Sequence, residues 1–182
     1  MDTPEWLEDL RAGLADPLPA TGWVAVAGAL ALPLLVALGR TEDGWMPFLD
    51  GINLLFHEAG HPLFGLFGWE TLALLGGTLM QVLVPLLLAG HFRWRRHPLG
   101  FVLALQWAAQ NLLNIARYLA DARTQVLPLV GGGEHDWGTL LGQWHLLARD
   151  TEIAGRVAVL GWIGLLLPAL WMAWRAWRRS GA

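Results

Sequence analysis

The residues that could do chemistry are concentrated in the pentapeptide His57-Glu58-Ala59-Gly60-His61, an H-E-x-x-H motif inside an apolar segment. At about 3.6 residues per turn, the two histidines lie one above the other on one helix face and can bind a single Zn²⁺ ion. Glu58 then lies beside a water molecule that the ion activates, where a general base is needed. Three ionisable side chains are costly in a membrane helix unless they bind something. The motif therefore predicts a zinc site; the alternative is that both histidines only form hydrogen bonds to neighbouring helices.

The motif and its surroundings resemble the site-2 protease family of intramembrane zinc metalloproteases, whose H-E-x-x-H lies within a transmembrane helix. The resemblance covers residues 56–61 and extends more weakly to the two glycines at 76–77. It implies hydrolysis of a peptide bond inside or at the edge of the bilayer, with zinc as the cofactor. By this resemblance, His57 and His61 would be metal ligands and Glu58 the general base.

The third protein ligand is left open by the sequence. The family takes it from an Asp in an N-P-x-x-x-x-D-G segment of a later helix, and this sequence contains no such segment. A catalytic zinc ion needs three protein ligands and one open position. We expect His135 first, because imidazole is a favoured ligand and a Gly-rich approach lets the chain fold back, and Asp121 second. Asp136 and His145 are the remaining candidates, and the alternative role for Asp136 is to cap a helix.

Polar side chains follow one face of the apolar segment at 99–120, at intervals of three or four residues. Such a stripe cannot face lipid. In one interpretation it lines a wet cavity that leads to the metal, with Arg117 binding a carboxylate or a developing oxyanion. In the other it forms hydrogen bonds between helices, with Gln81 as a partner and Arg117 paired with Asp121. The residues of this stripe are Gln106, Gln110, Asn114, Arg117 and Asp121.

Two side chains upstream of the motif are placed to support it. Asn53 and Asp50 lie on or near the helix face that carries His57 and His61, one and two turns before the motif. Either could orient a ligand histidine by a hydrogen bond to its second ring nitrogen. Helix capping or packing is the alternative for Asp50.

The composition places these residues in a membrane protein. Hydrophobic residues make up 55% of the 182 residues and charged residues only 15%, whereas about a quarter charged is usual in soluble domains. Five apolar segments each approach the roughly 20 residues that a helix needs to cross a bilayer. We therefore expect an all-α integral membrane protein, one transmembrane domain over residues 1–182 with about five spans. The expected spans are residues 21–39, 45–68, 72–90, 99–120 and 153–174.

Two further helices are expected outside these spans. Residues 1–20 carry apolar side chains at helical spacing after Thr3 and Pro4, which predicts a short N-terminal surface helix. Three glycines at 131–133 precede a second amphipathic pattern. This pattern predicts a hinge and a re-entrant or amphipathic outer helix that begins near Asp136.

The arginines predict an orientation. If five spans alternate, Arg40, the cluster at 93–96 and the arginines at 175–179 share one side, which is cytoplasmic by the positive-inside rule. We expect a bacterial inner-membrane protein with its N-terminus outside and its C-terminus in the cytoplasm. The net charge of −3 and the short arginine clusters beside apolar runs argue against nucleic acid as a partner.

Together these features predict a zinc-dependent, membrane-embedded metallopeptidase. The absence of cysteine leaves nitrogen and oxygen atoms as metal ligands. The expected partners are membrane lipids and a membrane protein or peptide substrate. The main alternative is a zinc hydrolase that acts on a lipid or small amide, because the motif does not distinguish leaving groups. A metal-binding or transport protein is a third possibility, although a transporter should carry ionisable groups on both sides of the site.

Overall fold

The regular structure of this chain is helical throughout the residues that the computed structural model describes, which are 4–15, 17–130 and 133–180. The all-α prediction is confirmed for these residues. Thr3 and two of the three expected hinge glycines, Gly131 and Gly132, lie outside them. The helices are α1 (Glu5–Ala15), α2 (Trp23–Gly39), α3 (Leu49–Gly65), α4 (Glu70–Trp94), α5 (Pro98–Ala120), α6 (Asp136–Gln143) and α7 (Asp150–Ser180), with a short 3-10 turn, Leu147–Arg149, before α7.

Three helices of the described chain are long and apolar enough to cross a membrane. They are α4, α5 and the helical run Leu147–Ser180 that contains α7, and α2 is a shorter apolar helix. Large apolar side chains cover their outward faces; on α7, Leu160, Leu167 and Leu170 are each 58% exposed. Extended apolar surface of this kind suits contact with lipid, which is compatible with the expected membrane protein.

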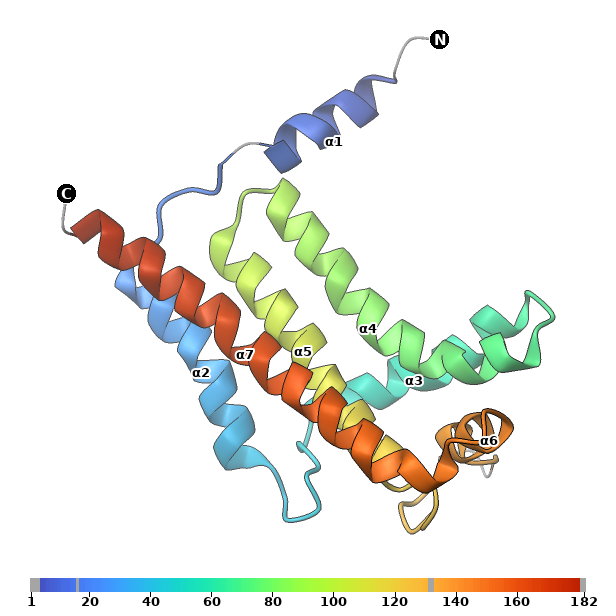
Figure 1. The fold of residues 1–182 in the computed structure, drawn as a ribbon. Coiled ribbons are helices and arrows are strands. Elements are labelled where there is room, and N and C mark those ends of the chain that lie inside the picture. The colour runs from blue at the N-terminus through green and yellow to red at the C-terminus, as the bar shows by residue number, and fades with distance from the viewer. Residues whose placement is uncertain (1–3, 16, 131–132, 181–182) are drawn as a thin grey trace.

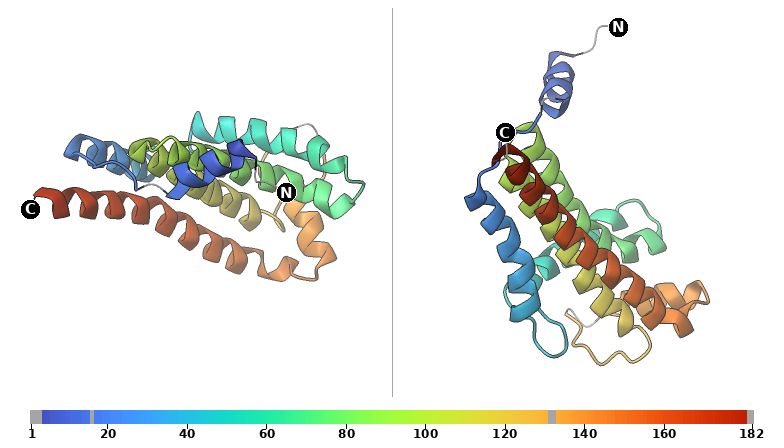
Figure 2. Two further views of the ribbon diagram at one scale, coloured as in Figure 1. Left: turned by 90° about the horizontal axis from the view of Figure 1, so that it is seen from above. Right: turned by 60° about the vertical axis from the view of Figure 1, so that its left-hand side comes forward.

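The central helix of the bundle is α5. It packs between α4 and α7, and α2 contacts both α5 and α7 (Figures 1 and 2). Gln106 of the polar stripe is fully buried here, and its amide donates to the main-chain oxygens of Ala29 in α2 and Leu165 in α7, both at 2.8 Å. This side chain therefore joins three helices and does not line a cavity.

The two ends of the bundle differ in chemistry. At one end, arginines bind the N-terminal segment: Arg93 donates to the main-chain oxygen of Gly13 at 3.2 Å, and Arg175 to that of Leu18 at 2.6 Å. The segment before α2 and the C-terminal part of α7 therefore lie together, as Figure 1 shows. At the opposite end lie α6 and the loop between α2 and α3.

This arrangement differs from the expected alternation of five spans. From the arginine-rich end, α2 runs to the opposite end, where Asp43 of the following loop pairs with Arg117 near the end of α5. Arg40 therefore does not share an end with Arg93 and Arg175. The N-terminal segment also lies at the same end as the C-terminal part of α7, whereas the alternation places them at opposite ends.

The path of α3 explains the difference. This helix begins beside the middle of α5, where the indole of Trp107 donates to Asn53 at 2.8 Å. It then runs toward the α6 end, where His57 lies against Tyr118 near the end of α5. The loop between α2 and α3 starts at the α6 end and enters the bundle before α3 begins. Helix α3 therefore runs back to the α6 end, and α4 begins there.

Candidate metal centre

His57, His61 and Asp136 come together at the α6 end of the bundle. The Nε2 atom of His57 is 2.9 Å from Oδ2 of Asp136, and Nε2 of His61 is 3.4 Å from the same oxygen. The potential ligand atoms of the three residues all lie within 4.8 Å of one another. Two imidazole nitrogens and a carboxylate oxygen are a donor set that suits a three-ligand zinc site.

Both histidine rings are held through their other nitrogen. Nδ1 of His61 is 2.9 Å from the main-chain oxygen of Ala73, so this nitrogen must donate its hydrogen. Nδ1 of His57 is 2.9 Å from Oε1 of Gln81. In a neutral ring whose Nδ1 donates, Nε2 carries a lone pair. In both rings, that lone pair is then on the side of the Asp136 carboxylate.

This arrangement calls for a positive charge between the rings and the carboxylate. Two lone-pair atoms 2.9 Å apart repel each other unless a proton or a cation lies between them. When no ion is bound, that positive charge is a proton on a ring: burial by itself raises the pKa of Asp136, but hydrogen bonds donated by His57 and His61 outweigh burial and lower that pKa to about 2. The group is therefore ionised at neutral pH, and the cluster has the charge and the donor atoms that suit a divalent cation.

Gln81 is oriented in turn by α5. Its side-chain nitrogen donates to Oδ1 of Asn114 at 2.9 Å and to Oδ1 of Asn111 at 3.3 Å. These bonds turn the amide oxygen toward His57. Because outer hydrogen bonds of this kind typically change metal affinity by about 10–100-fold, Asn114 supports the cluster through Gln81.

The start of α6 decides which side chain reaches the histidines. His135 is the N-cap, and its Nδ1 accepts a hydrogen bond from the amide of Gly138 at 3.1 Å. Asp136, the first residue of the helix, contacts His57 instead. The expectation from the sequence is the reverse, with Asp136 as cap and His135 as ligand. An unprotonated Nδ1 can accept the hydrogen bond that an N-cap side chain must accept from the first turn of the helix. The carboxylate of Asp136 is therefore free to contact His57.

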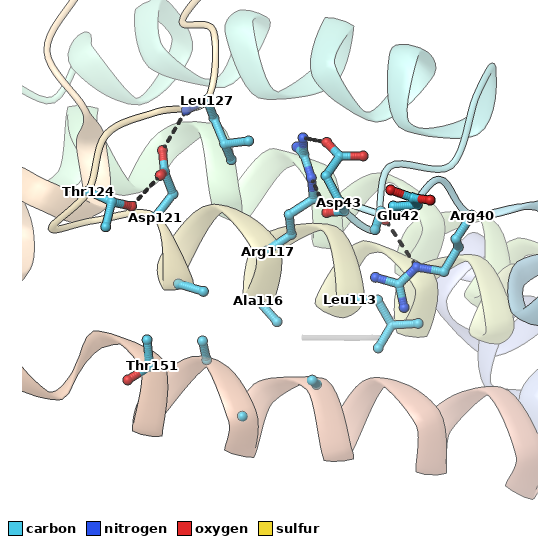
Figure 3. Close-up of a pocket in the computed structure, with 15 residues that line it drawn as sticks. Arg40, Glu42, Asp43, Leu113, Ala116, Arg117, Asp121, Thr124, Leu127 and Thr151 are labelled. Carbon is cyan, nitrogen blue, oxygen red and sulfur yellow. Dashed lines mark hydrogen bonds and ion pairs between the residues drawn. The ribbon is translucent and has the colours of Figure 1, made fainter.

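The other candidate ligands lie elsewhere. Nε2 of His135 is 3.6 Å from Asp121, and its ring stacks on Tyr118. Asp121 accepts hydrogen bonds from the Thr124 hydroxyl and from two amides of the loop after α5, and so holds that loop (Figure 3). His145 is exposed just after α6, at a φ of 56°. The structure therefore does not bring these three candidates into the cluster of the two motif histidines.

Asp50 and Asn53 belong to a separate buried network. Gln110 donates to Oδ1 of Asp50 at 2.6 Å, and Asn53 donates to Oε1 of Gln110 at 2.7 Å. These bonds anchor the start of α3 against the middle of α5. None of the three side chains bonds to a motif histidine, so their role in the described structure is to position the helix.

A cavity of about 980 Å³ gives access to the cluster. It is lined by His57, Glu58 and His61, and also by Arg117 and Asp43, which form an ion pair with each other. The same ion pair lines a smaller groove of about 490 Å³ between α5 and α7 (Figure 3). Arg117 is therefore paired with the loop after α2, and not with Asp121 on its own helix.

Close packing of α3 on α4 depends on glycines. A Cβ atom at Gly60 would lie 2.1 Å from the main-chain oxygen of Gly76, and a Cβ atom at Gly77 would lie 2.6 Å from the ring of His57. Real Cβ atoms do not approach other atoms so closely. The two glycines at 76–77 therefore make room for α3 and for the first motif histidine.

Replacing Gly77 with alanine should displace the His57 ring and weaken zinc binding by at least about tenfold, the lower end of what misorientation of a ligand costs. Gly90→Ala is the matched control, because Gly90 lies in the same helix and a Cβ atom there meets nothing within 4 Å. Competition with a chromophoric chelator measures both affinities. Equal zinc affinity in the two variants would contradict the close approach of Gly77 to His57.

The sequence predicts no role for Tyr118, and it predicts Gln81 only as a hydrogen-bond partner between helices. Tyr118 follows Asn114 by four residues, and Gln81 follows Gly77 by four. Residues four apart share a helix face. The signal in the sequence is therefore this spacing: Tyr118 and Gln81 each lie one helical turn beyond a candidate residue on the same helix face.

Comparisons with protein-family models, with curated proteins and with solved structures find no match to this chain. The class of protein is therefore defined by the fold and the site. It is an all-helical protein, compatible with a membrane location, with three helices of membrane-spanning length among its described residues. At one end it carries a His57–His61–Asp136 cluster that could bind a metal ion.

Proposed function

We propose that this chain is a zinc-dependent, membrane-embedded metallopeptidase that hydrolyses a peptide bond in or at the membrane. The observation that carries the proposal is the pair of imidazole nitrogens next to the Asp136 carboxylate, with Glu58 in the same cavity. His57, His61 and Asp136 would hold the ion, because two nitrogens and one oxygen suit zinc and leave one position open. When bound, the ion would polarise the scissile carbonyl and make a water molecule more acidic.

The residues of the chain would manage the protons. Glu58 accepts a proton from the attacking water and returns it to the leaving nitrogen, first as general base and then as general acid. Gln81 and the main-chain oxygen of Ala73 hold the Nδ1 hydrogens of the two histidines. Both Nε2 atoms then stay available as ligands throughout the reaction.

The size of the cavity favours a peptide over a small amide. Its volume of about 980 Å³ is at the upper end of the roughly 300–1,000 Å³ that is usual for small-molecule sites. Apolar residues from Val126 to Val130 line it on the side of the loop after α5. A cavity of this size and lining has room for several apolar side chains of a substrate segment.

The same proposal places the protein in a bacterial inner membrane. Four helices, α2, α4, α5 and α7, would cross the bilayer, and α3 would enter from the α6 end and return to it. The arginine-rich end would be cytoplasmic by the positive-inside rule. Both the N-terminal and the C-terminal segments would then be cytoplasmic, and the metal centre would lie in the outer half of the membrane.

Labelling of single-cysteine variants with a membrane-impermeant maleimide tests this topology, because the chain contains no cysteine. Glu134→Cys should be labelled in intact cells, since the segment before α6 would face outward. Leu14→Cys and Ser180→Cys should be labelled only after permeabilisation. Labelling of Leu14→Cys from outside, with Ser180→Cys protected, would instead support five alternating spans.

Hydrolysis assays test the function. The zinc-loaded protein in detergent micelles should cleave internally quenched peptides of apolar sequence. Treatment with 1,10-phenanthroline should abolish cleavage, and added Zn²⁺ should restore it, because the reaction needs the ion. Cleavage that survives removal of the metal would contradict the proposal, and release of fatty acid from vesicles without any peptide cleavage would favour a lipid hydrolase.

A further inference from the structure

Tyr118, the single tyrosine of the chain, lies at the edge of the metal centre. Its ring meets the ring of His57 edge-on, at 5.8 Å between centroids, and stacks on His135 at 4.1 Å. Its hydroxyl accepts a hydrogen bond from the amide of Asp136 at 3.1 Å. Three contacts therefore hold the phenol, two of them with residues of the cluster.

The hydrogen of this phenol is available to a substrate. A tyrosine hydroxyl can donate one hydrogen bond in addition to those it accepts. Its partner within the described chain is the Asp136 amide, and that bond uses a lone pair of the oxygen. The O–H has no acceptor among the described residues, and Tyr118 lines the cavity that contains Glu58 and the two motif histidines.

We propose that Tyr118 donates this hydrogen bond to the oxyanion that develops on the scissile carbonyl, an inference that rests on the proposed peptidase function. The water oxygen bonds to the carbonyl carbon, the carbonyl electron pair moves onto its oxygen, and Glu58 takes the proton from the water. The C–N bond then breaks as that electron pair returns, and Glu58 gives the proton to the leaving nitrogen. Tyr118 keeps its own proton and stabilises the negative charge.

Arg117 is the cationic alternative for this role, and its contacts argue against it. Both Nε and Nη2 of its guanidinium donate to Asp43, and the group lies over the ring of Trp45 at 5.4 Å. Tyr118 contacts His57 and the amide of Asp136 directly. The geometry at the cluster therefore favours the phenol as the oxyanion donor.

Binding of acetohydroxamate to the Co²⁺-substituted protein tests the role without a peptide substrate. The probe places a carbonyl oxygen at the metal, and the visible absorption of Co²⁺ reports its binding. Tyr118→Phe should keep one cobalt ion per chain and bind acetohydroxamate about tenfold more weakly, because one hydrogen bond to a charged oxygen is lost. Arg117→Gln should not weaken binding, and neither should the control Trp174→Phe, which removes the N–H donor of an exposed side chain outside the cavity.

Unchanged acetohydroxamate affinity in Tyr118→Phe, or a tenfold loss in Arg117→Gln alone, would overturn the proposal. If Tyr118→Phe loses cobalt, biosynthetic 3-fluorotyrosine provides a second test, because it replaces only this residue and makes its hydroxyl a stronger donor. Tighter acetohydroxamate binding by the fluorinated protein then supports the proposal, and equal or weaker binding overturns it.

Peptide hydrolysis separates this role from the function on which it rests. Tyr118→Phe should lower kcat by about 10²-fold, the typical cost of removing one oxyanion donor, with little change in KM. Absence of cleavage by the wild-type protein would overturn the peptidase function. A Tyr118→Phe variant that cleaves at the wild-type kcat would overturn only the role of Tyr118.

Discussion

A variant with Asp136→Ala should bind zinc more than about 10²-fold more weakly than the wild-type protein and should be purified without stoichiometric metal. Loss of a ligand should exceed the roughly 10–100-fold cost of losing an outer hydrogen bond. Asp136 supplies the oxygen that lies 2.9 Å from His57 and 3.4 Å from His61, and His57 and His61 alone cannot complete a three-ligand site. Elemental analysis gives the zinc content, and competition with a chelator gives the affinity.

Asp150→Ala is the matched control. Asp150 is also a buried aspartate, but it begins α7 and pairs with Arg123 at 2.9 Å. This variant should lose the ion pair and keep its zinc. His135→Ala should still bind stoichiometric zinc, with an affinity below that of the wild-type protein but above that of Asp136→Ala, because loss of the N-cap destabilises α6, which positions Asp136, by only about 1 kcal/mol. A zinc-free His135→Ala protein together with a zinc-containing Asp136→Ala protein would make His135 the third ligand.

The variant Glu58→Gln should retain zinc and helical content but hydrolyse peptides about 10²–10⁴-fold more slowly, which is the usual contribution of a general base. Glutamine preserves the size of the side chain and removes its ability to take a proton. Glu58 lines the cavity but is not a member of the His57–His61–Asp136 cluster, so the metal should stay bound.

Glu70→Gln, an exposed position at the start of α4, is the control and should leave kcat unchanged. Zinc content, circular dichroism and kcat should be measured on the same preparations. Loss of zinc from Glu58→Gln would make Glu58 a ligand and leave the reaction without this base. Full activity in Glu58→Gln would rule out the proposed mechanism directly.

Local properties of the sequence determined the helical class and two of the three residues of the candidate metal centre. The apolar runs at 72–90, 99–120 and 153–174 correspond to α4, α5 and α7. They could be predicted because the hydropathy of a segment depends only on the residues within it. The spacing of His57 and His61 is sufficient to place both rings on one face, where their centroids lie 4.8 Å apart. Helical periodicity is a property of the local backbone and needs no distant contact.

Only the tertiary structure decided that Asp136 joins these histidines and that α3 begins inside the bundle. Asp136 is 79 positions from His57, and its place depends on the cap that His135 forms at the start of α6. The start of α3 likewise depends on the bond between Asp50 and Gln110, which are 60 positions apart. Helical periodicity does not relate residues that are this far apart in the sequence. Apolar composition does not distinguish a helix that crosses the whole bundle from one that starts within it. Such choices follow from packing and hydrogen bonding between distant segments, which routinely override local propensity.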